Sequence, residues 1–93
     1  MLVFEWDDAK REANYAHHKV RFETVENANW DSARYFPDQR RNYQEGRILA
    51  YFLIEDRLHA MVFTIRKSGV RIISLRRANN REIDRYVEEL NRS

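Results

Sequence analysis

The fold of this chain is decided by the stretch VRIISLRRANNRE, residues 70–82. Its first half is rich in β-branched and apolar residues and predicts a buried strand that ends in two arginines, Arg76 and Arg77. Its second half predicts the start of a helix. Asn79 and Glu82 have the spacing of a capping box, in which each side chain accepts a hydrogen bond from the other residue's backbone N–H. The junction of strand and helix therefore carries fixed positive charge.

More strands are predicted upstream of this stretch, at residues 34–36, 48–54 and 58–65. Pro37 places the first of them at a sheet edge, because proline has no N–H to donate. Hairpin turns are expected at Asp56-Arg57 and at Lys67-Ser68-Gly69, and a further turn at Gly46. These segments predict a meander of antiparallel strands.

Helical patterns flank the meander. A short strand at Leu2 to Glu5 precedes a helix from Asp8 to His18, capped by Asp7 or Asp8, and a second short helix is expected around Phe22. In the last helix Ile83, Val87 and Leu90 recur at helical spacing, so this face must dock on something apolar. The predicted fold class is α+β: a small antiparallel β-sheet with N-terminal helices and a C-terminal helix packed on one of its faces.

Composition limits the function. The length of 93 residues fits a single domain over residues 1–93, and the absence of cysteine excludes disulfides and thiolate chemistry. No apolar run is long enough to span a membrane and the acidic N-terminus does not resemble a secretory signal, so we expect a cytoplasmic protein with no membrane partner. Residues 66–81 contain six basic side chains and no acidic one, which indicates an anionic partner or a solvated charged face.

Arginine is the residue type best suited to phosphate, since its guanidinium stays charged and makes forked contacts. Side chains alternate along a strand, so Arg76 and Arg77 should point to opposite faces. Arg76 is expected beside Ser74, Ile72 and Val70, and Arg77 beside Leu75, Ile73 and Arg71. Arg66 ends the neighbouring strand opposite Val70 or Arg71, so it need not lie near Arg76.

Several other side chains have both a functional and a structural interpretation. His18 can shuttle a proton or complement a helix dipole, and Glu82 can act as a base or only as a cap. Tyr86 can donate to a phosphate and Trp6 can stack on a base, or both can belong to the core. No metal site or other cofactor is expected. His17 and His18 point in different directions on a helix, and His59 stands alone on a strand.

Taken together, these segments resemble the BrnT family of toxins from bacterial type II toxin–antitoxin systems. The matching residues are Phe4-Glu5-Trp6-Asp7, Lys10, Asn14, His18, Val20, Phe22, Arg47, Leu58 to Thr64, Arg66, Arg71 to Ala78, Glu82, Arg85 and Tyr86. The match follows the chain in order over nearly its whole length. It departs at His17-His18-Lys19, where the family usually reads Lys-His-Gly. Glycine is the residue best suited to a left-handed helix end, so its loss costs about 1 kcal/mol.

The resemblance implies a fold like that of the RelE ribonucleases, metal-independent cleavage of RNA, and inhibition of translation and growth. It also implies a BrnA-type antitoxin that forms a complex with two copies of each protein and binds DNA. On this basis the candidate catalytic residues are Arg66, Arg76, Arg77, His18 and Glu82. The candidate RNA contacts are Lys10, Trp6, Arg47, Arg71 and Tyr86. A module that binds nucleic acid without cleaving it, and an interaction protein that pairs with an acidic partner, remain alternatives.

Overall fold

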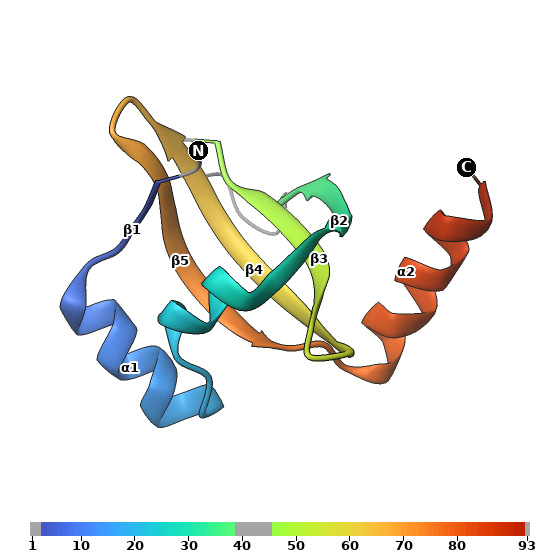
Figure 1. Cartoon of the computed structure of the whole chain (residues 1–93), viewed down its shortest axis with the longest axis horizontal. Coiled ribbons are helices and arrows are strands. Elements are labelled where there is room, and N and C mark those ends of the chain that lie inside the picture. The colour runs from blue at the N-terminus through green and yellow to red at the C-terminus, as the bar shows by residue number, and fades with distance from the viewer. Residues whose placement is uncertain (1–2, 39–45, 93) are drawn as a thin grey trace.

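The computed structural model describes residues 3–38 and 46–92 and shows an α+β protein built on one five-stranded sheet (Figure 1). The elements in chain order are β1 (Phe4–Glu5), α1 (Asp8–His18), the 3₁₀ helix η1 (Phe22–Asn27), β2 (Ala28–Pro37), β3 (Ile48–Ile54), β4 (Arg57–Arg66), β5 (Gly69–Arg77) and α2 (Asn80–Arg92). Leu2 and most of the turn expected at Gly46 lie outside the described residues.

The sheet has the strand order β1-β5-β4-β3-β2. Strands β2 to β5 pair antiparallel, as predicted, and β2 lies at an edge. The prediction of a wholly antiparallel sheet is wrong for β1, which pairs parallel to β5. Parallel neighbours need a long connection, and here α1, η1 and three strands separate β1 from β5 in the sequence. The sheet is therefore mixed.

Helix α1 has the predicted bounds, and its two ends explain why. The carboxylate of Asp7 accepts a hydrogen bond from the backbone N–H of Lys10 at 3.1 Å. At the other end Lys19 adopts a left-handed conformation with φ of 59°, and its N–H donates to the carbonyl of Tyr15 at 2.8 Å. The position at which the family resemblance expects glycine is thus left-handed in this chain as well.

Both hairpin turns have two residues. The first starts one residue earlier than expected, and the second is one residue shorter than expected. Glu55 and Asp56 form the first turn, with φ of 50° and 62°, one residue before the predicted position. Lys67 and Ser68 form the second, so Arg66 pairs with Gly69 rather than with Val70 or Arg71. A Cβ at Gly69, whose φ is 148°, would clash with the carbonyl oxygen of Val3. Glycine there lets the chain before β1 approach β5.

Strand β5 contains a β-bulge that the alternating pattern does not reveal. Val62 of β4 pairs with Ser74, and the next residue, Phe63, pairs with Ile72. Ile73 is therefore an extra residue in β5, and the alternation of its side chains is interrupted at this point.

The bulge changes which side chains share a face. Ile72 and Leu75, three positions apart, are both fully buried in the same apolar cluster. Arg77 lies on their side of the sheet, and Arg76 lies on the other. The two arginines point to opposite faces as predicted, but the grouping of Ile72 with Arg76 was wrong.

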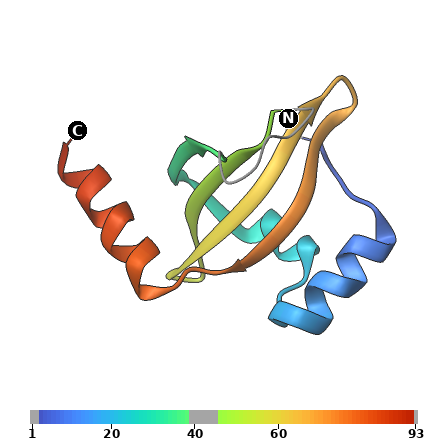
Figure 2. The same ribbon diagram turned by 180° about the vertical axis from the view of Figure 1, so that it is seen from behind.

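The helices lie on opposite sides of the sheet (Figures 1 and 2). On one side Val20, Phe22 and Val25 from the α1–η1 segment pack on the apolar face that includes Phe52 and Leu75. On the other side Tyr86 of α2 packs against a smaller group of sheet residues, Tyr51, Leu58 and Ala60. Placing all helices on one face was therefore wrong, because the sheet is apolar on both faces at this end.

Helix α2 leans away from the sheet beyond its first turns (Figures 1 and 2). Ile83, Val87 and Leu90 are 39%, 46% and 38% exposed. Within the described residues the apolar surface on which this stripe is expected to dock is not found, and the expectation stays a prediction. No helix in the described part of the chain is long and apolar enough to cross a membrane.

Candidate active site

The end of β5 and the start of α2 are joined by one ion pair. The guanidinium of Arg76 makes two hydrogen bonds to the carboxylate of Glu82, at 2.6 and 2.8 Å. Glu82 also completes the predicted capping box, accepting from the N–H of Asn79 at 3.0 Å while its own N–H donates to the Asn79 side chain at 2.9 Å. The hydroxyl of Tyr51 donates to the same carboxylate at 3.4 Å. Arg76 is thus held in place by a partly buried carboxylate.

The protonation state of Glu82 follows from these contacts. Burial raises its pKa, but the hydrogen bonds from Arg76 and from the Asn79 backbone, together with the charge of Arg76, outweigh burial and lower the pKa below its ordinary value. A carboxylate with a lowered pKa is a weak base. Glu82 is therefore better suited to position Arg76 than to remove a proton.

Arg76 lines a hollow of about 450 Å³ between the sheet and α2, which we call the Arg76 hollow. Its lining residues are Pro37, Asp38, Leu49, Tyr51, Arg76, Asn79, Arg81, Glu82 and Arg85. The guanidinium of Arg85 also lies over the ring of Phe36, 4.0 Å from its centre. The arginines come from a rigid strand and a capped helix, so positive charge is fixed at this position.

His18 lies within electrostatic reach of Arg76. It is the last residue of α1, and its ring contacts the ring of His17 at 4.5 Å between centres. Burial lowers the pKa of His18, and the charges of His17 and Arg76 lower it further. The imidazole is therefore neutral near pH 7 and can accept a proton.

The residue that holds α1 against β5 is Asn14, for which the sequence analysis proposed no role. Its side-chain amide donates to the carbonyls of Leu75 and Val20, at 2.7 and 3.0 Å, and its oxygen accepts from the N–H of Leu75 at 3.1 Å. Asn14 is buried. A polar residue at helical spacing among alanines was the available signal, but its partner is 61 positions away in the sequence.

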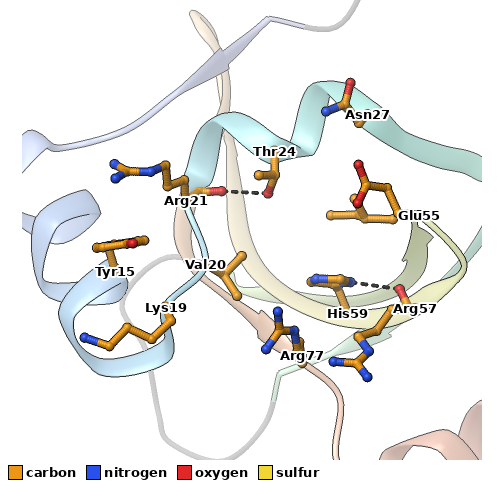
Figure 3. A pocket seen from close by; sticks show the side chains of 11 residues that line it. Tyr15, Lys19, Val20, Arg21, Thr24, Asn27, Glu55, Arg57, His59 and Arg77 are labelled. Atoms are coloured by element: carbon orange, nitrogen blue, oxygen red, sulfur yellow. Dashed lines mark hydrogen bonds between the residues drawn. The ribbon is translucent and has the colours of Figure 1, made fainter.

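Arg77 belongs to a different hollow, on the α1–η1 side of the sheet (Figure 3). This hollow of about 480 Å³, which we call the His59 hollow, is lined by Tyr15, Lys19, Val20, Arg21, Thr24, Asn27, Ile54, Glu55, Arg57, His59 and Arg77. His59 and Arg77 are direct partners in the pairing of β4 with β5. The structure therefore separates Arg76 from Arg77.

Arg66 lies at the far end of the sheet. Arg66 pairs with Gly69, whereas Arg76 pairs with Ala60. The six steps from Ala60 to Arg66 span about 20 Å along β4. The sequence pattern does not require Arg66 to lie near Arg76, and the structure does not bring the two together.

Arg71 also lies toward that end of the sheet, where it forms an ion pair with Glu5 at 3.0 Å. It is therefore engaged within the β1–β5 edge rather than at the Arg76 hollow.

The remaining predicted RNA contacts are dispersed. Tyr86 is buried, and its hydroxyl donates to the carbonyl of Ser32 at 2.6 Å. Trp6 packs edge-on against Phe22, 6.0 Å between ring centres. For Tyr86 and Trp6 the core interpretation describes the observed contacts.

The other two predicted RNA contacts are Lys10, which lies within α1, and Arg47, which comes just before β3. Lys10 is exposed on the first turns of α1. The carbonyl of Arg47, just before β3, accepts from the N–H of Asp38 at 2.9 Å. Neither residue is among those that line the Arg76 hollow.

Arg76 and Glu82 form a contacting pair, and His18 lies within electrostatic reach of Arg76, so this end of the sheet offers a fixed cation and a neutral imidazole. Such a pair can stabilise negative charge and accept a proton, which are the two requirements of phosphodiester cleavage by an internal hydroxyl. Among the described residues, no three His, Asp or Glu side chains gather closely enough to hold a metal ion.

Comparison with known proteins agrees with this chemistry. A search of curated proteins found no match. A model of a protein family, described as the ribonuclease toxin BrnT of type II toxin–antitoxin systems, matches residues 6–82. The match covers most of the chain, from Trp6 through α1 and all of β2 to β5 to the carboxylate that holds Arg76. The chain with this arginine cluster therefore belongs to the BrnT family of ribonuclease toxins.

Proposed function

We propose that this chain cleaves RNA at the Arg76 hollow without a metal ion. The 2′-hydroxyl of the RNA attacks the adjacent phosphorus, the bond to the 5′-oxygen breaks, and a cyclic phosphate and a free 5′-hydroxyl result. The observation that supports this site best is the doubly hydrogen-bonded Arg76–Glu82 pair at the end of β5, with His18 in reach of its charge.

Each residue has one task in this proposal. His18 takes the proton of the 2′-hydroxyl, since its lowered pKa leaves the imidazole neutral. Arg76 stabilises the charge that develops on the non-bridging oxygens, and Arg81 and Arg85 add positive charge to the same hollow. Glu82 is a positioning residue. Arg77 belongs to the other hollow, and Arg66 is left out because it lies too far away.

The test is the substitution Arg76→Ala, with cleavage of a labelled transcript as the readout. We expect a loss of about 10²–10³-fold in rate, as for other preorganised donors. Glu82→Gln keeps the cap and should lose less. Arg92→Ala removes an exposed arginine at the end of α2 and should cleave normally. Thermal unfolding of each variant separates loss of chemistry from loss of fold.

The outcomes separate the alternatives. Undiminished cleavage by Arg76→Ala refutes the assignment. Transcripts that are bound but intact with the unmodified protein favour a binding module instead. Cleavage that persists in EDTA supports the metal-independent route, and loss of cleavage in EDTA rejects it.

The pH profile tests the role of His18. Because its folded pKa lies below 6.5, the cleavage rate should stay high down to that pH and fall only in more acidic buffer. His18→Asn should lower the rate and remove this acidic limb. A limb that remains in His18→Asn would assign the base to another group.

Membership of a type II toxin family implies an antitoxin partner, and the exposed stripe of α2 is a surface that such a partner can cover. We propose that an antitoxin segment covers Ile83, Val87 and Leu90. In the described part of the chain no basic side chain pairs with the flanking Asp84 or Glu88, so the complementary segment is apolar with basic flanks. The expected complex contains two copies of each protein, binds DNA through the antitoxin and lies in the cytoplasm.

A further inference from the structure

The His59 hollow concentrates positive charge on the face of the sheet opposite Arg76. Lys19, Arg21, Arg57 and Arg77 all line it, and Glu55 is the one carboxylate among its lining residues (Figure 3). Within residues 3–38 and 46–92 none of these four cations forms an ion pair. A concave site with so many like charges and few counter-charges favours an anion.

Neighbouring elements place two of the cations. The guanidinium of Arg21 lies over the ring of Tyr15 on α1, 4.1 Å from its centre. The pairing of β5 with β4 places the backbone of Arg77 opposite His59. A flat guanidinium is also a surface on which a nucleobase can stack.

His59 adds a hydrogen-bond acceptor to this basic hollow. The residue is buried, with 7% of its surface exposed, and its Nδ1 lies 2.8 Å from the carbonyl oxygen of Arg57. A carbonyl only accepts, so Nδ1 carries the hydrogen. Burial lowers the pKa of the ring despite that hydrogen bond, and the charges of Arg77 and Arg57 act in the same direction as burial. The ring is therefore neutral at pH 7, with the lone pair on Nε2.

The lone pair faces the hollow. Figure 3 shows the nitrogen of His59 that is not bound to Arg57 pointing toward Val20 and Arg77. In the described part of the chain no group donates to it. A ligand for this site must combine an anion, for the cations, with a hydroxyl that donates to Nε2.

We propose that the His59 hollow binds an uncleaved ribonucleotide of the RNA, next to the nucleotide that is cut. Arg57 and Arg77 hold its phosphate, and its 2′-hydroxyl donates to His59 Nε2. DNA has the same phosphate but lacks this hydroxyl, so His59 distinguishes RNA from DNA. Arg76 and Arg77 are consecutive residues at the end of β5, so an RNA strand that crosses this end meets both hollows.

The inference rests on the proposed function only in naming RNA as the ligand, and its test measures binding instead of cleavage. Labelled RNA and DNA oligonucleotides of one sequence are mixed rapidly with each variant, and fluorescence anisotropy is recorded before cleavage proceeds. His59→Asn keeps a donor to the Arg57 carbonyl but is too short to place an acceptor at the position of Nε2. His59→Gln keeps an acceptor at the position of Nε2.

The expected pattern is specific. His59→Asn should weaken RNA binding by about tenfold, the value of one hydrogen bond, and leave DNA binding unchanged. His59→Gln should retain the preference for RNA. Arg57→Gln should weaken RNA and DNA binding equally. Arg92→Gln removes the same charge outside the hollow and should weaken binding less than Arg57→Gln does.

The contrary results are equally clear. If the unmodified protein shows no preference for RNA, or if His59→Asn keeps it, the hollow does not read the 2′-hydroxyl and the inference fails. That failure leaves the nuclease proposal intact as long as cleavage still depends on Arg76. Conversely, if the protein prefers RNA through His59 but cleaves no RNA, the binding site is supported and the nuclease proposal is refuted.

Discussion

At the scale of single residues, Lys19 occupies a backbone position that suits glycine. Its φ of 59° closes α1, and its side chain lines the His59 hollow. A non-glycine residue in this conformation costs about 1 kcal/mol. The chain therefore combines a strained helix end with a cation at a proposed binding site.

The substitution Lys19→Gly should raise the free energy of unfolding by about 1 kcal/mol and weaken RNA binding, because strain and charge are removed together. Urea denaturation and anisotropy measure the two effects. Lys19→Ala is the matched control, since it removes the charge and keeps the strain. It should bind RNA as weakly as the glycine variant without the gain in stability. Equal stability of the two variants would show that the left-handed conformation carries no strain.

At the scale of elements, backbone hydrogen-bonding groups on the outer edge of β5 are paired by a side chain. Within the described residues β1 pairs with Val70 and Arg71, and farther along β5 the backbone of Leu75 bonds to Asn14. This attachment fixes the last turn of α1, and with it His18, beside the end of the strand. The amide of Asn14 thus continues the role of an edge strand.

Asn14→Ala should lower the free energy of unfolding by at least about 2 kcal/mol, because each buried backbone group left without a partner costs about 1–3 kcal/mol. Cleavage should also decline in protein that remains folded, since His18 loses its support. Chemical denaturation and single-turnover cleavage at low temperature measure these effects. Asn91→Ala, at the exposed end of α2, is the control. A variant as stable as the unmodified protein would remove Asn14 from this role.

The stripe on α2 gives a second prediction at this scale. Val87→Asp should change the free energy of unfolding by less than about 1 kcal/mol, the range of helix propensities, because the side chain is already 46% exposed. It should abolish co-purification with the antitoxin while RNA cleavage continues. Val87→Ile keeps the stripe apolar and should still form the complex. Retention of the antitoxin by Val87→Asp would place the interface elsewhere.

Local sequence patterns predicted most helices and strands, whereas features that depend on residues distant in the sequence were missed. The bounds of α1 follow from Asp7 and from the helix end at Lys19, and the capping box at Asn79 was read from two side chains three positions apart. The parallel pairing of β1 and the bulge at Ile73 depend on partners distant in the sequence. For the same reason Arg76 and Glu82 could be found, whereas the roles of Asn14 and His59 could not.

At the scale of the whole molecule, stability should depend on pH in two steps. His18 and His59 have lowered pKa values in the fold, with burial as the main cause for both. In the unfolded chain histidine titrates near 6.5, so the unfolded state binds protons first as the pH falls below that value. The histidine contribution is therefore present above pH 6.5 and is lost below it.

The second step lies lower. Glu82 and Glu5 also have lowered pKa values, so their contribution is present above the ordinary value of 4.5 and is lost as the pH falls further. The free energy of unfolding from urea titrations should therefore decrease from pH 7 to 5 and again below 4.5. His59→Gln should flatten the first decrease. A first step of the same size in that variant would show that His59 does not contribute.

The carboxylate of Glu82 couples two properties that mutation usually changes separately. It starts α2 and it orients Arg76, so the direction in which the helix leaves the sheet and the position of the guanidinium share one anchor. A substitution at position 82 that removes the acceptor oxygens alters both at once. Lineages that re-aim α2 to suit a new inhibitor must therefore preserve these oxygens or rebuild the proposed catalytic end of the sheet along with the helix.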